Sequence, residues 1–187
     1  NSVRNFTAAR RVVIKVGTNL LTRGNSLNIE YMNSMSAQIA DLVQQGYQVL
    51  LVSSGAIGMG ASELGLTASV TEILMRQACA AIGQPLLMHQ YRESFQRHDI
   101  RIAQVLMTRE VLNNRRTYLN LRNSVEKLLS LQVVPIFNEN DSISTAEIGN
   151  AFGDNDQLSA LVASKVDADV LIILSDIDAL YDGDPKG

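Results

Sequence analysis

The chain has 187 residues, of which 46% are hydrophobic and 19% charged, and its formal net charge is −3. This size and balance predict one domain with a substantial core, and the lack of a basic surplus argues against a nucleic-acid partner. No apolar run approaches the roughly 20 residues that span a bilayer, no signal-peptide pattern opens the chain, and a single cysteine, Cys79, excludes an internal disulfide. We therefore expect a cytoplasmic protein without a membrane partner.

The first predicted strand, Val12–Val16, contains Lys15 in an otherwise apolar run and is followed by Gly17 and Thr18. Buried lysines are rare and need an anion or a partner. The pattern therefore indicates a lysine directed towards a phosphate, with backbone N–H groups beside it. A lysine on an edge strand, facing water, is the equally supported alternative.

A helical pattern over Glu30–Gln45 stops at Gly46 and leads to the second predicted strand, Gln48–Val52. The small residues Ser53-Ser54-Gly55-Ala56 follow this strand and precede a helix-compatible stretch. A helix N-terminus of this kind offers N–H donors to a carboxylate or phosphate. A capping serine with a glycine for a tight turn is the simpler interpretation.

The middle of the chain is predicted to be mainly helical. The pattern over Thr71–Gln96 indicates one long helix or two, with a break near Gly83-Gln84-Pro85. Cys79 lies in a run of small residues there, which is typical of a packed core position. A third strand over Ile102–Met107 and a helix over Arg116–Leu131 follow.

Two polar clusters dominate the last third of the sequence. Asn138-Glu139-Asn140-Asp141 closes the apolar run Val133–Phe137, and Asp154-Asn155-Asp156 opens the helical pattern Gln157–Val166. Unpaired polar groups are costly at the end of a buried strand, so the clusters suggest a site for a polar small molecule. Helix capping, with Asp154 and Gln157 at capping-box spacing, explains the second cluster but not the first.

The last predicted strand, Val170–Leu174, is followed by Ser175 and Asp176, for which an ordinary exit turn is a sufficient interpretation. Strands that alternate with helices predict a mainly parallel sheet covered on both faces. Ligands of such sheets bind beyond the carboxyl ends of the strands, where the polar residues of this chain gather. Neither a phosphate-binding P-loop nor a dinucleotide fingerprint is present. The two histidines, at 89 and 98, lack the spacing of metal ligands, and no metal site is predicted.

These pieces together resemble the amino acid kinase family, and within it the branch that phosphorylates glutamate. The resemblance covers nearly the whole chain and rests on six segments in family order: residues 13–18, 52–57, 80–84, 134–141, 152–160 and 174–181. It implies an αβα sandwich around a mainly parallel sheet, the fold shared with carbamate kinase. It also implies ATP-dependent phosphorylation of the γ-carboxylate of L-glutamate, the first step towards proline.

The resemblance also implies roles for individual residues. Lys15 would stabilise the transferring phosphoryl group, and Asp156 would orient Lys15. The glutamate-binding positions would be Ser54, Asn138, Asp141, Asp154 and Asn155. Gly17 and Thr18 would line the phosphate path, while Ser175 and Asp176 would face the nucleotide. Mg²⁺ would arrive on ATP without a dedicated protein cage, and a homo-oligomer with proline as a feedback inhibitor is expected.

Departures from the family pattern leave alternatives open. Arg76 and Ala179 stand where the family more often has lysine and glycine, away from the expected chemistry. The family domain continues past the position of Gly187 into a nucleotide-binding segment with a second catalytic lysine, so residues 1–187 are expected to be a kinase domain without that segment. A regulatory module that only binds glutamate or proline, and a related kinase for acetylglutamate or uridylate, are the competing interpretations.

Overall fold

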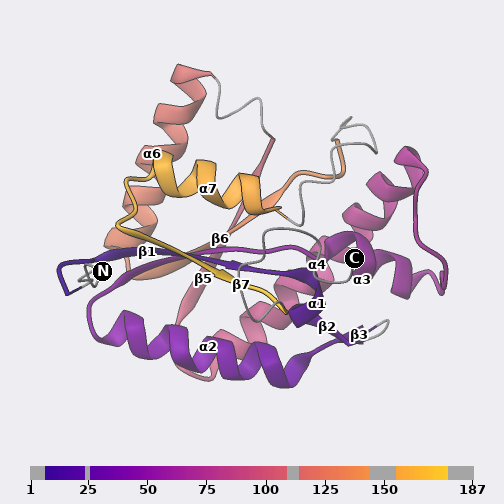
Figure 1. Ribbon diagram of the computed structural model, residues 1–187, viewed down its shortest axis with the longest axis horizontal. Coiled ribbons are helices and arrows are strands. Elements are labelled where there is room, and N and C mark those ends of the chain that lie inside the picture. The colour runs from indigo at the N-terminus through magenta and orange to yellow at the C-terminus, as the bar shows by residue number, and fades with distance from the viewer. Residues whose placement is uncertain (1–6, 24–25, 109–113, 144–154, 177–187) are drawn as a thin grey trace, which may run out of the picture.

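The computed structural model describes residues 7–23, 26–108, 114–143 and 155–176, and these form three layers (Figure 1). The middle layer is a parallel sheet of five strands in the order β5-β6-β4-β1-β7. The strands are β1 (Arg11–Val16), β4 (Gln48–Val52), β5 (Arg101–Met107), β6 (Val133–Glu139) and β7 (Val170–Leu174). All five strands predicted from the sequence are confirmed, and so is the three-layer architecture.

Helices cover both faces of the sheet. One face packs against α2 (Ile29–Gln44) and α4 (Ile73–Gln96), and the other against α6 (Arg115–Ser130) and α7 (Asp156–Lys165) (Figure 1). Alternate residues of β1 enter the two cores, with Ile14 in the first and Val13 in the second. Lys15 shares the Val13 side because side chains alternate along a strand, so it projects towards the layer that contains α7.

Several short elements surround the carboxyl ends of the strands. The chain forms a short helix α1 (Thr18–Leu21) and a small antiparallel pair, β2 (Thr22–Arg23) and β3 (Ser26–Leu27), which the sequence pattern did not predict. Helix α3 (Ala56–Glu63) begins after Gly55, whose φ of +95° lies in the left-handed region that glycine tolerates best. The serine pair is thus followed by a helix, as expected.

The predicted break in the long helical segment is wrong, because α4 runs without interruption through Pro85. Gly83, two residues before Pro85, allows α4 to approach α3 closely. A Cβ on Gly83 would lie 1.8 Å from the carbonyl oxygen of Ala56, and one on Gly60 would lie 1.8 Å from that of Cys79. Backbones of α3 and α4 therefore touch directly, and Cys79 is a fully buried core residue at this crossing, as predicted.

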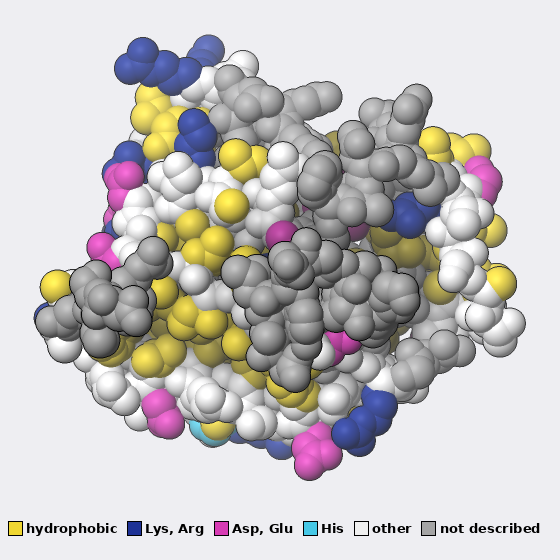
Figure 2. Space-filling view, viewed as in Figure 1, with side chains coloured by type: hydrophobic (Ala, Val, Ile, Leu, Met, Phe, Trp, Pro, Cys, Tyr) yellow, Lys and Arg dark blue, Asp and Glu magenta, His cyan; other side chains and the backbone are white. Residues whose placement is uncertain are grey.

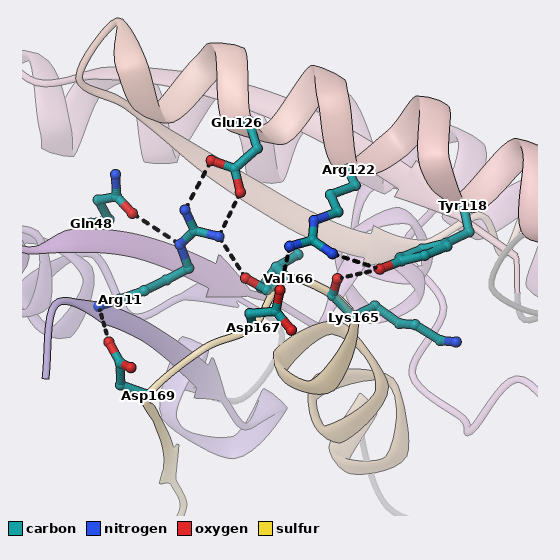
Figure 3. A network of polar contacts seen from close by, with 9 residues as sticks. All are labelled: Arg11, Gln48, Tyr118, Arg122, Glu126, Lys165, Val166, Asp167 and Asp169. Carbon is teal, nitrogen blue, oxygen red and sulfur yellow. Dashed lines mark hydrogen bonds and ion pairs between the residues drawn. The ribbon is translucent and has the colours of Figure 1, made fainter.

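A polar network holds the amino-terminal end of the sheet to α6 and α7 (Figure 3). The Arg11 guanidinium donates to both carboxylate oxygens of Glu126, at 2.7 and 2.9 Å, and to the backbone carbonyl of Val166 at 2.6 Å. The backbone N–H of Arg11 donates to Asp169 at 2.8 Å, and hydrogen bonds from the backbone N–H groups of Arg11 and Arg10 lower the pKa of that carboxyl. Because Val166 ends α7, this network fixes the far end of the helix whose first residue is Asp156.

The edge strand β7 is only partly covered. Ile172 and Ile173 are 38% and 49% exposed. Figure 2 shows hydrophobic side chains at the surface over the part of the sheet where β7 lies in Figure 1. No helix in the described part of the chain has the length and apolar character needed to cross a membrane.

Candidate active site

Lys15 is the buried cation at the centre of the site. It lies on β1, between β4 and β7, so the alternative of a water-facing lysine on an edge strand is wrong. Its residue exposure is 3%, and its Nζ lies 2.7 Å from Oδ1 of Asp156, a carboxylate that remains half exposed. The ion pair fixes the direction of the ammonium while the solvent side of the carboxylate stays accessible.

Asp156 is the first residue of α7, and Asn155 before it has a left-handed backbone conformation. Asn155 has φ of +65°, a left-handed conformation that asparagine tolerates better than most residues, and its side chain forms no capping hydrogen bond. The predicted cap at Asp154 lies outside the described residues. For Asp156, contact with Lys15 replaces the capping interpretation.

A chain of side-chain amides joins this pair to the neighbouring strands. The Asn155 amide nitrogen donates to the Ser53 carbonyl at 2.7 Å and to Oδ1 of Asn138 at 2.9 Å. Asn138, only 2% exposed, donates from its own amide nitrogen to Oε1 of Gln84 at 2.8 Å. Gln84 in turn donates to Oε1 of Gln104 at 3.0 Å. The two polar clusters predicted to form one site are thus in direct contact.

Ser54 lies at the junction between β4 and the loop after β1. Its hydroxyl donates to the carbonyl of Val16 at 2.9 Å and accepts from Oγ1 of Thr18 at 3.1 Å. The backbone N–H of Gly17 donates to the Leu174 carbonyl at 3.1 Å. These contacts hold the Gly17-Thr18 loop at the carboxyl ends of β1, β4 and β7.

Asp141 lies apart from the lysine, in a cavity of about 280 Å³. The pKa of Asp141 is raised to about 6, mainly by burial and also by the negative charge of Glu139, while Arg76 partly offsets both. The remaining lining includes Ala56, Ala81, Gln84, Pro85, Gln104 and Leu106. Because Pro85 has no N–H for the Ala81 carbonyl, this wall also contains a backbone acceptor without its usual helical partner.

The last two predicted positions follow β7 and are exposed. Asp176 accepts from the Asn19 side-chain amide at 3.0 Å, which places it beside α1. Ser175 precedes it at the same edge. Among the described residues, no group of three or more His, Cys, Asp or Glu side chains is arranged to hold a metal ion.

Gln84 and Gln104 were missed as members of the site. Gln84 was interpreted as part of a helix break, and Gln104 stood unremarked in the third strand. A polar side chain inside an otherwise apolar strand was the available signal for Gln104. For Gln84 the available signal was its place in the segment 80–84 that resembles the family, because glutamine is otherwise an ordinary helix residue.

A parallel sheet between two helical layers, with a buried lysine paired to an aspartate at the carboxyl end of an inner strand, defines a three-layer α/β protein with a site suited to an anion. The sequence profile described as "Amino acid kinase family" matches residues 10–187. The chain therefore belongs to the amino acid kinase family.

Individual relatives carry a more specific name. A glutamate 5-kinase from Methanosarcina acetivorans is 50% identical over 189 residues, covering 97% of this chain and 49% of the relative. A glutamate 5-kinase from Geobacter sulfurreducens is 47% identical over 182 residues, covering 97% and 48%. One from Acinetobacter baylyi is 44% identical over 184 residues, covering 98% and 48%. The chain spans about half the length of the curated relatives it matches.

Proposed function

We propose that the complete natural protein transfers the γ-phosphoryl group of ATP to the γ-carboxylate of L-glutamate. A carboxylate oxygen forms a bond to the γ-phosphorus, the bond from that phosphorus to the bridging oxygen breaks, and γ-glutamyl phosphate and ADP result. The observation that carries the proposal is the ion pair between buried Lys15 and half-exposed Asp156, beside the Asn138–Asn155 contact. The names of the relatives support glutamate as the acceptor.

Phosphoryl transfer needs little covalent chemistry from the protein, and depends on positioning and on charge stabilisation. Lys15 supplies a positive charge whose direction Asp156 holds before the reaction starts. An ammonium arranged in advance costs no reorganisation when charge develops on the transferring oxygens. Gly17 and Thr18 are proposed to line the path of the phosphates, with Ser175 and Asp176 on the nucleotide side.

Glutamate is proposed to lie between Lys15 and the cavity. Its γ-carboxylate points to the lysine, and its ammonium faces Asp141, with Ser54, Asn138, Asp154 and Asn155 as further contacts. Mg²⁺ fits this site as a companion of ATP, because it keeps most of its ligands as water and phosphate oxygens and needs few carboxylates from the protein. It would supply further neutralisation of the phosphate charge.

We also propose that the complete protein is a cytoplasmic homo-oligomer and that proline inhibits it.

The substrate assignment is tested by ADP release from the complete protein, with glutamate, N-acetylglutamate, aspartate and UMP as separate acceptors. We expect turnover with free glutamate alone, because Asp141 selects an unacylated ammonium. Equal turnover with N-acetylglutamate would overturn the assignment, as would ATP-independent binding of glutamate without any ADP release.

A further inference from the structure

The directions of the Asn138 and Asn155 amides are set by backbone groups that cannot exchange roles. The N–H of Glu139 donates to Oδ1 of Asn138 at 2.9 Å, so the oxygen of that amide must face this N–H. The carbonyl of Ser53 accepts from Asn155 at 2.7 Å, so the nitrogen of that amide must face the carbonyl. A backbone N–H can only donate and a carbonyl can only accept, which makes both orientations unambiguous.

These anchors fix Gln84 as well. With its oxygen turned to Glu139 and Asn155, Asn138 has only its nitrogen for Gln84, and it donates to Oε1 at 2.8 Å. The nitrogen of Gln84 is therefore turned the other way, where it donates to Oε1 of Gln104 at 3.0 Å. A primary amide carries two N–H donors. Gln84 thus keeps a second N–H without a partner among the described residues.

The side chain that carries this donor borders a cavity. Gln84 lines the same cavity of about 280 Å³ as Glu139 and Asp141. Ala56, the first residue of α3, lines it too, so the positive end of a helix dipole adds to the donor side. A lining that combines two carboxylates with N–H donors matches a ligand that carries both an ammonium and a carboxylate.

We propose that Gln84 is a specificity-determining residue that donates its amide N–H to the α-carboxylate of the amino acid substrate. Glu139 and Asp141 face the ammonium of the same molecule, and the side chain of the substrate extends towards Lys15. This inference rests on the proposed function, since it assigns one end of the proposed substrate to one residue.

The decisive variant is Gln84→Glu. A glutamate at this position still accepts from Asn138, so the orientation of the amide chain is kept, but it has no N–H to offer. The test uses the complete protein and compares kcat/KM for glutamate with kcat/KM for glutamic acid α-amide, which retains the γ-carboxylate and the ammonium. We expect the glutamate-to-amide ratio to fall at least tenfold, which corresponds to about 1.4 kcal/mol.

Two further variants separate hydrogen bonding from charge. Gln84→Met removes the donor without adding a charge, and it should also lower the ratio. Gln90→Glu places the same new charge on the same helix, at a side chain that bonds Ser94 instead of the site, and it should leave the ratio unchanged. Thermal melting is followed in parallel, because loss of stability lowers activity with both substrates and leaves their ratio intact.

An unchanged ratio in Gln84→Glu would overturn the assignment of the α-carboxylate. A ratio that falls in Gln84→Glu but not in Gln84→Met would also overturn it, because charge repulsion alone would then explain the effect. A wild-type protein that phosphorylates neither compound would instead contradict the proposed function, so the two failures are distinguishable.

Discussion

The buried charge of Lys15 is stabilised by an ion pair. An ammonium removed from water is costly unless it is paired, and the carboxylate of Asp156 at 2.7 Å supplies that pairing. The two residues come from different layers of the fold, one from the sheet and one from the first turn of α7. The same pair that stabilises the charge also directs it towards the loop after β1.

Replacement of Lys15 should therefore affect the chemical step more than binding. In the complete protein, Lys15→Met should lower kcat roughly 100- to 1000-fold, since one lost contact to developing charge typically costs about 2.7–4 kcal/mol. Steady-state kinetics with varied glutamate check this, with the exposed Lys127→Met as a control. A normal kcat with a raised KM for glutamate would show that Lys15 only binds substrate.

At Asp141 the ionised carboxylate is expected to lower the stability of the fold and, at the same time, to bind the ammonium of the substrate. Its pKa of about 6 in the fold exceeds the ordinary 3.8, so the folded state binds the proton more tightly than the unfolded chain does. Stability therefore falls as pH rises from 3.8 towards 6, and above that range the ionised carboxylate costs on the order of 2–3 kcal/mol.

Asp141→Asn should consequently raise the melting temperature of the ligand-free protein by several degrees at pH 7.5, and change it little near pH 4. The same variant should raise the KM for glutamate, because the ammonium loses its carboxylate partner. Thermal scans at both pH values and kinetics at pH 7.5 test the pair of effects. The exposed Asp41→Asn is the control, and a lower melting temperature at pH 7.5 would contradict the argument.

At the scale of elements, the crossing of α3 and α4 positions the cavity wall. Gly83 permits backbone contact at Ala56, and the next residue along α4 is Gln84. The crossing therefore brings the amide of Gln84 to the N-terminal end of α3. Pro85 follows without breaking the helix, which shows that packing against α3 and the sheet outweighs the cost of one lost hydrogen bond.

Gly83→Ala should separate the two helices. The added methyl would lie 1.8 Å from a backbone oxygen, a contact that only movement of a helix relieves, so we expect a loss of several kcal/mol. Chemical denaturation measures this. Gly58→Ala in α3 is the matched control, because no atom lies within 4 Å of the new Cβ, and it should be neutral or stabilising by up to ~1 kcal/mol. Equal destabilisation by both variants would refute the role of the crossing.

At the scale of the whole molecule, the edge strand β7 presents Ile172 and Ile173 to solvent. Exposed apolar strand edges promote association. We propose that a second phosphate-binding lysine and much of the nucleotide site of the complete protein lie outside residues 1–187. Relatives about twice as long are consistent with a site built from more than these residues.

We expect a polypeptide of residues 1–187 to release no ADP in response to glutamate, because stabilisation of the transition state from one side alone loses most of its electrostatic assistance. It should also associate, and Ile173→Lys should reduce that association. Coupled ADP assays and size-exclusion chromatography test the two statements. Activity equal to that of the complete protein would refute the first.

The sequence by itself determined the five strands of the main sheet, the parallel α/β architecture and the family. Val-, Ile- and Leu-rich runs that alternate with amphipathic segments permit few other arrangements, and polar residues at the strand ends indicate where a ligand binds. It also indicated that Asn138 and Asn155 belong to one site, since the first cluster ends a buried strand and the second opens a helix a short connection later.

Only the tertiary structure decided which partners these residues have. Whether Lys15 is buried depends on the strand order, which places β1 between β4 and β7, and no local pattern encodes that order. Continuity of α4 through Gly83 and Pro85 depends on contact with α3, a separate helix that ends at Glu63. The participation of Gln84 and Gln104 depends on the same long-range packing. Local sequence governs backbone preference and periodicity, whereas hydrogen-bond partners distant along the chain are set by the way the layers pack.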